Sequence, residues 1–79
     1  MSGSAVDELA RQLRADYDAA PRGRQAASIH LFGIRHAQAL RGVSKSAVAE
    51  RAGLPKSYGT EINKGVQLSE YVAITKPLV

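Results

Sequence analysis

The sequence contains no cysteine and no tryptophan, and its aromatic residues are three Tyr and one Phe. Without cysteine, a disulfide framework, a thiolate metal site and a cysteine nucleophile are all excluded. No apolar run is long enough to span a bilayer, and residues 1–4 lack the basic and apolar segments of a signal peptide. We therefore expect a protein of the reducing cytoplasm without a membrane segment.

Acidic residues are scarce after residue 20. Residues 1–20 carry two Arg against four acidic side chains, a net charge of −2, whereas residues 21–79 carry nine Lys or Arg against three, a net charge of +6. A basic surface of this kind attracts polyanions, of which nucleic acid is the usual one. The length predicts one domain, 1–79, whose core is small enough to favour homodimerisation.

Two helical patterns fill the first half of the chain. Apolar residues recur at steps of three and four over 5–20, which predicts an N-terminal helix capped by Ser4, with Asp7 in the capping-box position. After a turn, a second pattern predicts one helix from about 25 to 41, with Gly42 as its C-terminal cap. The core face of this helix is expected to contain Ile29, Phe32, His36 and Leu40.

The segment 43–65 has the spacing of a helix-turn-helix. Two helices that cross steeply through a short turn need a small residue where their backbones approach, and Ala49 supplies it four residues before Gly53. Gly53 accommodates the positive φ of the turn, and Leu54 is expected to fill the angle between the helices. The side chains expected to face inward are Val48, Ala52, Leu54 and Ile62.

Caps delimit the two helices of this motif. Ser44 is expected to cap the first, and Ser57, close behind Pro55, the second, which spans about 56–64. Gly65 is expected to close that second helix. The fold class is thus all-α, a compact bundle of four to five short helices containing a helix-turn-helix, with a short C-terminal strand or helix.

The motif resembles the phage-repressor type of bacterial helix-turn-helix, whose second helix follows a Gly-Leu turn and ends in Ile-x-x-Gly, as in Ile62-Asn63-Lys64-Gly65. The resemblance covers about 25 residues and, more loosely, the flanking helices. The stretch from Ile29 to Leu40 also resembles small uncharacterised bacterial proteins with a helix-turn-helix-like domain, which implies no particular activity.

The phage-repressor resemblance implies where DNA would bind, because in that family the second helix lies in the major groove. The residues it implies for this helix are Lys56, Ser57, Tyr58, Thr60, Glu61, Asn63 and Lys64. Among these residues, the resemblance implies contacts with base edges for Lys56, Ser57, Thr60 and Glu61. The first helix would contact phosphates through Ser44, Lys45 and Ser46, and Arg41 is a further candidate for a phosphate contact.

Two residues depart from the family pattern. Gly59 stands where the family usually has Val or Ile, six residues after the turn glycine, so either Tyr58 fills the space or the second helix is irregular. Glu61 would repel phosphate unless it accepts a hydrogen bond from a cytosine amino group.

No pattern indicates catalysis or a metal site. His30 and His36 are six residues apart, without the i, i+4 spacing or the acidic co-ligands of a metal helix, and the serines have no histidine near them in sequence. We therefore expect no enzyme, no metal and no cofactor.

The segment 66–79 is compatible with a short helix or with a strand over 71–75 that ends before Pro77. Tyr71, Val72 and Ile74 are expected in the core, and the segment is the candidate dimer contact.

Together these features favour a DNA-binding transcriptional regulator, a dimeric repressor that reads double-stranded DNA in the cytoplasm, at the nucleoid. Two alternatives remain. One is a protein-interaction module, such as an antitoxin or anti-activator, that binds another protein through the same surface. The other is a nonspecific architectural DNA binder.

Overall fold

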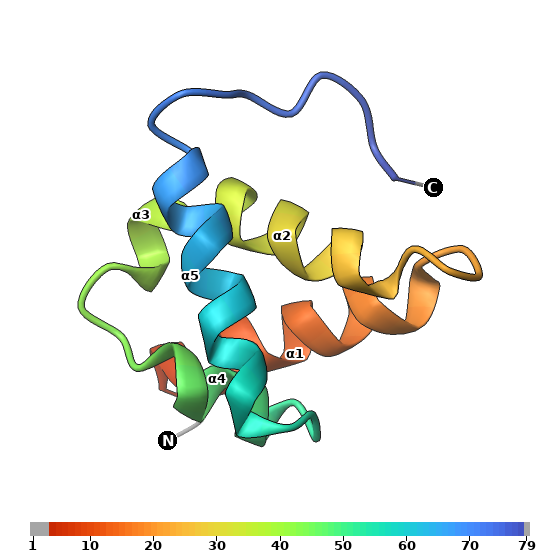
Figure 1. Ribbon diagram of the computed structural model, residues 1–79. Helices are drawn as coiled ribbons and strands as arrows, with labels where there is room; N and C mark the ends of the chain where they lie inside the picture. The colour runs from red at the N-terminus through yellow and green to blue at the C-terminus, as the bar shows by residue number, and fades with distance from the viewer. Residues whose placement is uncertain (1–3, 79) are drawn as a thin grey trace.

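The computed structural model describes residues 4–78, and within them the chain forms five α-helices and one 3-10 turn. The elements are α1 (Ala5–Ala19), α2 (Gln25–Arg35), α3 (Ala37–Leu40), α4 (Lys45–Arg51), η1 (Lys56–Tyr58) and α5 (Gly59–Leu68). No strand occurs among the described residues, so the all-α expectation is confirmed. Figure 1 shows α5 crossing α2, and α1 packs against both α2 and α4.

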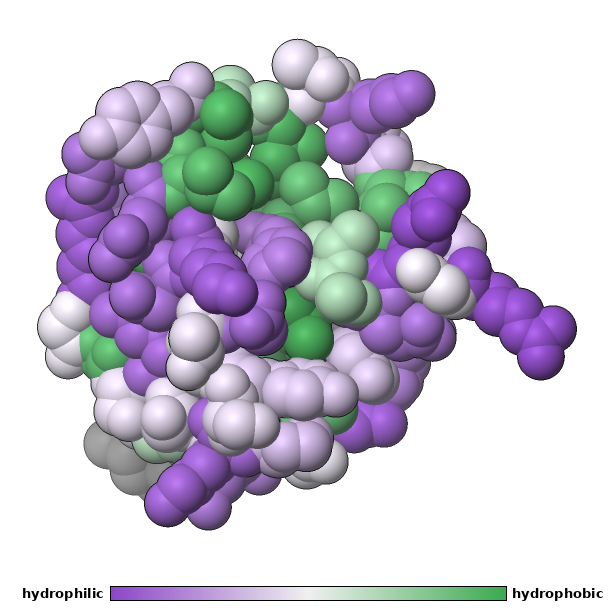
Figure 2. Space-filling model, in the orientation of Figure 1, coloured by the Kyte–Doolittle hydropathy of each residue, from purple (hydrophilic) through white to green (hydrophobic). Residues whose placement is uncertain are grey.

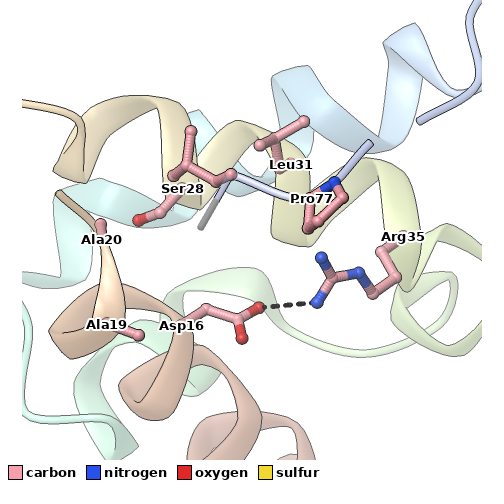
Figure 3. A pocket seen from close by; sticks show the side chains of 8 residues that line it. Asp16, Ala19, Ala20, Ser28, Leu31, Arg35 and Pro77 are labelled. Atoms are coloured by element: carbon pink, nitrogen blue, oxygen red, sulfur yellow. Dashed lines mark hydrogen bonds and ion pairs between the residues drawn. The ribbon is translucent and has the colours of Figure 1, made fainter. Parts of the chain in front are cut away.

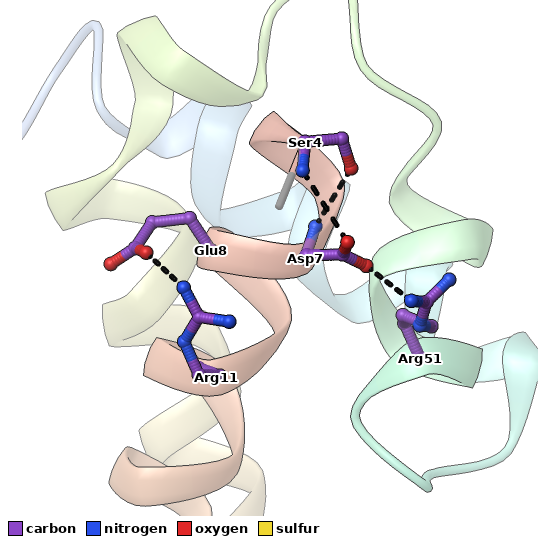
Figure 4. Close-up of polar contacts among 5 residues, drawn as sticks. All are labelled: Ser4, Asp7, Glu8, Arg11 and Arg51. Carbon is purple, nitrogen blue, oxygen red and sulfur yellow. Dashed lines mark hydrogen bonds and ion pairs between the residues drawn. The ribbon is translucent and has the colours of Figure 1, made fainter. Parts of the chain in front are cut away.

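The first helix begins and ends close to where the sequence predicts. Ser4 Oγ accepts a hydrogen bond from the Asp7 N–H at 3.2 Å, and Asp7 Oδ2 accepts one from the Ser4 N–H at 3.3 Å (Figure 4). This capping box satisfies two amides that the helix itself leaves without partners. At the other end, Ala20 has extended backbone angles, as is usual before a proline, and α1 stops at Ala19.

The single helix expected over 25–41 is wrong, because the chain bends at His36 and forms α2 and α3 instead. His36 has φ −107° and ψ 24°, and its ring packs against Phe32 with 4.8 Å between ring centroids. The bend turns α3 against α5, and Leu40 is still fully buried. The apolar spacing of three and four continues across the bend, so the sequence pattern does not reveal it.

The core lies between α1, α2, α4 and α5. Its largest fully buried side chains are Phe32, Leu13, Ile29, Leu40, Ile62 and Val48. Leu, Ile, Val and Ala therefore supply most of the interior, as the composition predicts, with Phe32 as its one buried aromatic ring among residues 4–78.

The chain beyond α5 differs from the expectation. α5 continues through Gly65 to Leu68, so the expected helix end at Gly65 is wrong. From there to Leu78 the described chain forms a turn and then no regular structure, so neither the strand over 71–75 nor a separate helix forms. Figure 1 shows this segment running back over α2.

Tyr71 and Val72 lie on the surface, 81% and 48% exposed, and their expected place in the core is wrong. Ile62 and Val66 of α5 are buried and already close the core on this side, which leaves the segment after α5 outside it. Ile74 is half-buried.

Candidate nucleic-acid interface

The turn between α4 and α5 is built as the sequence predicts. Gly53 has φ +81°, a conformation that only glycine adopts without strain. Its N–H donates to the Glu50 carbonyl at 2.9 Å, and the Leu54 N–H donates to the Ala49 carbonyl at 3.0 Å. This is the Schellman pattern, which satisfies the last carbonyls of a helix. Ala49 and Leu54 are both buried, so the predicted packing of the turn is confirmed.

The first helix of the motif also has its predicted cap and its predicted inner face. Ser44 Oγ accepts a hydrogen bond from the Ala47 N–H at 3.2 Å. Val48 and Ala52 of this part of the chain and Ile62 of α5 are buried. The sequence therefore located both helices and the side on which they meet.

The second helix begins later than expected. Residues 56–58 form the 3-10 turn η1, α5 starts at Gly59, and the expected range 56–64 is wrong at both ends. No side chain caps η1 or α5, so the expected cap by Ser57 is also wrong. The Tyr58 N–H instead donates to the Pro55 carbonyl at 3.0 Å, which closes the turn through the backbone.

Gly59 is explained by the approach of α4. A Cβ atom at this position would lie 2.7 Å from the Ser46 backbone nitrogen and 2.9 Å from Ser46 Cα. Backbone of α4 therefore occupies the space that Val or Ile fills in the phage-repressor pattern, and Tyr58 does not need to fill it. The same contact places the start of α5 beside the start of α4.

A pair of glycines, which the sequence analysis missed, sets the distance between α2 and α5. A Cβ atom on Gly65 would lie 2.3 Å from the His30 carbonyl oxygen and 2.9 Å from Gly33 Cα. A Cβ atom on Gly33 would lie 2.3 Å from the Ile62 carbonyl oxygen. The signal in the sequence was a glycine inside each helical pattern, where it lowers helix propensity and needs a packing reason.

α1 packs against α4, the first helix of the motif. Arg51 of α4 forms an ion pair with Asp7 at 2.7 Å (Figure 4), and Arg14 Nη1 donates to the Ala52 carbonyl at 3.2 Å. The second bond satisfies a carbonyl at the end of α4, where the helix dipole is negative. The two arginines therefore hold the C-terminal end of α4 on α1.

Glu61 turns toward α2. Its Oε1 lies 2.7 Å from His30 Nε2, and its Oε2 lies 3.3 Å from Lys64 Nζ. The hydrogen bonds from His30 and from Lys64 lower the pKa of Glu61 below its ordinary value, because both stabilise the carboxylate. The charge that the sequence analysis set against phosphate is therefore partnered within the protein.

Tyr58 leans on α1. It is half-buried, and its ring lies 6.5 Å from that of Tyr17, centroid to centroid. Burial is the main cause that raises the pKa of Tyr17, and the neighbouring Tyr58 adds to it. Part of the Tyr58 ring is thus committed to packing.

The other candidate DNA-binding residues lie along three adjoining segments. At and before α4, Arg41, Ser44 and Ser46 are exposed and Lys45 is half-buried; Lys56 and Ser57 are exposed in η1. On α5, Thr60 and Lys64 are exposed and Asn63 is half-buried. α4 packs against both η1 and α5, so these segments adjoin one another; Arg41 lies in the loop before α4.

The basic side chains divide into two groups. Four arginines and one lysine each pair with a carboxylate: Arg11 with Glu8, Arg14 with Asp18, Arg35 with Asp16, Arg51 with Asp7 and Lys64 with Glu61. Within residues 4–78, six basic side chains have no carboxylate within ion-pair distance: Arg22, Arg24, Arg41, Lys45, Lys56 and Lys76. The positive charge at the helix-turn-helix is thus less neutralised than the positive charge along α1.

A crevice lies between α1, α2 and the C-terminal segment, away from the motif (Figure 3). Its volume is ≈ 260 Å³, below the range usual for sites that enclose a small molecule. Asp16 and Arg35, which line it, are joined by an ion pair at 3.3 Å. Pro77 covers one side.

Within residues 4–78, no three His, Asp or Glu side chains lie close enough together to hold a metal ion. None of the helices described combines the length and the apolar character that crossing a membrane requires.

Comparison with known proteins gives a family for the chain. No curated protein and no solved structure matches it significantly. The family model described as "HTH-like domain" matches residues 5–75, which include every helix of the structure. Domains of this kind are in general DNA-binding and not enzymatic. The chain belongs to the HTH-like domain family.

Proposed function

We propose that this protein is a sequence-specific DNA-binding regulator of transcription that acts as a dimeric repressor on a two-part site. The observation that carries the proposal is the helix-turn-helix itself, with the start of α4 seated against the start of α5 at Ser46 and Gly59. In this geometry a helix can enter the major groove while the preceding helix touches the backbone. Repression would follow from occupying the DNA, without a cofactor.

Charge supports the proposal. Lys45 and Lys56 lie at the starts of α4 and η1 and have no carboxylate partner among residues 4–78. Their ammonium groups are available to phosphates, and each phosphate contact releases counterions and adds to the salt dependence of binding. We assign Lys45, Ser44, Ser46 and Arg41 to phosphates.

Thr60 is the residue we assign most directly to a base edge. It is exposed on the first turn of α5, next to the contact between Gly59 and Ser46. Lys56 and Ser57 precede it on η1, and Lys64 follows one turn later. Glu61, Tyr58 and Asn63 flank this row, and Glu61 serves mainly to hold His30 and Lys64.

Gly59 and Glu61, which depart from the phage-repressor pattern, are the residues that favour the alternative of a protein-interaction module. Both residues have contacts inside the protein, Gly59 with the Ser46 backbone and Glu61 with His30. These contacts give each residue a role that requires no protein partner, so we do not propose that function.

The test begins with duplexes selected from a random-sequence library by the full chain. Gel-shift titrations then compare the selected duplex, the DNA upstream of the gene and a scrambled duplex of the same length, from 50 to 200 mM salt. We expect the selected sequence to be bound at least about 10³-fold more tightly than the scrambled one at physiological salt. Equal affinity for all duplexes would identify a nonspecific architectural binder, and absence of binding would refute the proposal.

Three variants separate the assigned roles. Thr60→Ala should lose affinity for the selected duplex by about 1–3 kcal/mol and keep its affinity for the scrambled one. Lys45→Ala should weaken both and lower the salt slope by about 1. Lys76→Ala, outside the motif, is the matched control for lysine and should change neither. If Lys76→Ala and Lys45→Ala behave alike, the assignment of phosphates to α4 is wrong.

A further inference from the structure

A histidine outside the helix-turn-helix contacts a carboxylate on the second helix of the motif. His30 of α2 places its Nε2 2.7 Å from Oε1 of Glu61 on α5, and the two side chains are 36% and 34% exposed. The other carboxylate oxygen of Glu61, Oε2, lies 3.3 Å from Lys64 Nζ. Each oxygen of Glu61 therefore has one partner. We call His30, Glu61 and Lys64 the charge cluster.

The charge cluster lies at the edge of the exposed side of α5. Thr60 and Lys64 are exposed on this helix and Glu61 is half-buried, while Gly65, one turn after Glu61, is buried against α2. Residues four positions apart lie on the same side of a helix, so Glu61 and Gly65 share the side toward α2. Figure 2 shows strongly hydrophilic side chains gathered over the middle of α5. Glu61 therefore lies between the surface assigned to DNA and the contact with α2.

We infer that His30 is a positioning residue for DNA binding, and that a proton on its ring increases the affinity for DNA. This inference rests on the proposed function. With the ring neutral, the charges of Glu61 and Lys64 cancel; with a proton on the ring, the charge cluster has a net charge of +1. Histidine is the side chain that ordinarily changes its charge between pH 5 and 8. DNA is a polyanion and favours the protonated form, so by reciprocity the proton favours binding of DNA.

The other ionisable side chains near the charge cluster belong to the elements around α2 and α5. On α1, Asp16 pairs with Arg35 of α2 at 3.3 Å, and α3 carries no ionisable side chain. α4 and η1 pack against α5. The ionisable residues of these two elements and of the chain after α5 are Lys45, Glu50, Arg51, Lys56, Tyr58, Glu70, Tyr71 and Lys76. None of them contributes to the lowered pKa of Glu61, which the hydrogen bonds from His30 and then from Lys64 cause.

The contact between His30 and Glu61 also joins α2 to α5. A contact that only joined the two helices would act on the stability of the fold, and the affinity of the folded protein for DNA would not depend on pH. The pH profile of DNA binding therefore separates proton-dependent positioning from a purely structural role.

Gel-shift titrations of the selected duplex at 50 mM salt, from pH 8.0 to pH 6.0, test the inference. The wild type should bind roughly threefold or more tightly at pH 6.0, and the difference should shrink at 200 mM salt because salt screens the added charge. His30→Gln keeps a side-chain N–H that can donate to Glu61 but takes up no proton, so its affinity should not change over this range. A wild type without pH dependence, or a His30→Gln variant as pH-dependent as the wild type, overturns the inference.

His36→Leu is the matched control for histidine. His36 is half-buried against Phe32 and lies outside the charge cluster, so this variant should keep the pH dependence of DNA binding that the wild type shows. Circular dichroism at each pH establishes that the proteins remain folded. If His36→Leu loses the pH dependence, His36 carries it and the assignment to His30 is wrong.

Glu61→Gln tests the charge on the cluster. At pH 8.0 this variant leaves the charge of Lys64 without its carboxylate, so the charge cluster has the net charge of +1 that the wild type gains with a proton on His30. Glu61→Gln should therefore bind the selected duplex more tightly at pH 8.0 than the wild type does. If it binds no more tightly, the DNA does not sense the carboxylate and the inference fails.

NMR without DNA tests whether His30 holds Glu61. The side-chain carboxyl carbon of Glu61 reports the pKa of this group, and His30→Ala should raise that pKa toward its ordinary value, because the hydrogen bond from His30 is the main cause that lowers it. An unchanged pKa overturns the inference. DNA binding that does not depend on pH refutes the inference and leaves the proposed function intact. Absence of binding at every pH refutes the proposed function and the inference with it.

Discussion

Gly65→Ala should destabilise the protein although alanine is the better helix former. Propensity alone predicts a gain of about 1 kcal/mol for this change inside a helix. The new Cβ atom, however, would lie 2.3 Å from the His30 carbonyl oxygen and 2.9 Å from Gly33 Cα. Both neighbours are backbone atoms of α2, so neither can rotate away, and the two helices must separate by roughly 1 Å to reach ordinary contact distance.

The packing free energy lost when the helices separate exceeds the free energy gained from the higher helix propensity of alanine. Gly65 is buried at the crossing, and Ile62 and Val66 beside it lie in the core, so they lose dispersion contacts with α2 as the gap opens. Overpacking of this kind costs typically 1–3 kcal/mol, and a rigid backbone contact belongs at the upper end. We expect a net loss of roughly 2 kcal/mol and a fall in Tm of roughly 8–16 °C for a domain of this size.

Urea and thermal unfolding followed by circular dichroism measure this loss. Gly23→Ala is the matched control, because Gly23 has φ +79° and no atom within 4 Å of an added Cβ, so only backbone strain of about 1 kcal/mol applies there. Gly33→Ala should cost about as much as Gly65→Ala, and the double variant less than the sum, since the first substitution already separates the helices. A Gly65→Ala protein that is as stable as the wild type, or more stable, would refute the reasoning.

Three further changes have outcomes that the same unfolding assays check. Gly59→Val, which introduces a residue of the phage-repressor pattern, should destabilise by roughly 2 kcal/mol because Ser46 backbone fills the space; a gain in stability contradicts this. Burial lowers the pKa of His36 from 6.5, with Arg35 adding to it, so the unfolded chain binds the proton first and stability should fall as pH drops below 6.5. His36→Leu should flatten that pH dependence and add about 1 kcal/mol, since its Nε2 is buried without a hydrogen-bond partner among residues 4–78; an unchanged slope between pH 7.5 and 5.5 argues against it. Ser44→Ala should cost about 1 kcal/mol by removing the cap of α4, and no loss would show that water replaces the cap.

Much of the candidate site could be predicted because its signals are local. The cap at Ser44, the positive φ of Gly53 and the burial of Ala49 each depend on residues within a few positions. Steric and hydrogen-bonding preferences of this range are properties of the residue type. The sequence therefore located the helix-turn-helix and its turn.

The predictions that failed depend on residues far apart in the chain. The start of α5 at Gly59 follows from the approach of Ser46, and its continuation past Gly65 follows from the crossing at Gly33. In a single sequence, a glycine at a helix end and a glycine at a helix crossing look the same. Only the crossing partner distinguishes them, and no local pattern identifies that partner.

The sequence by itself determined that α4 and α5 form a helix-turn-helix. A small residue at the helix contact, a glycine in the turn and an apolar residue that fills the angle between the helices together fit this geometry. Tertiary structure alone decided what the second helix presents. In the folded chain Glu61 contacts His30 and Gly59 packs against α4, and Tyr71, which follows the helix, is exposed on the surface. The reason is physical: the side of a helix that remains exposed depends on which other elements cover it, and that is settled only when the whole chain packs.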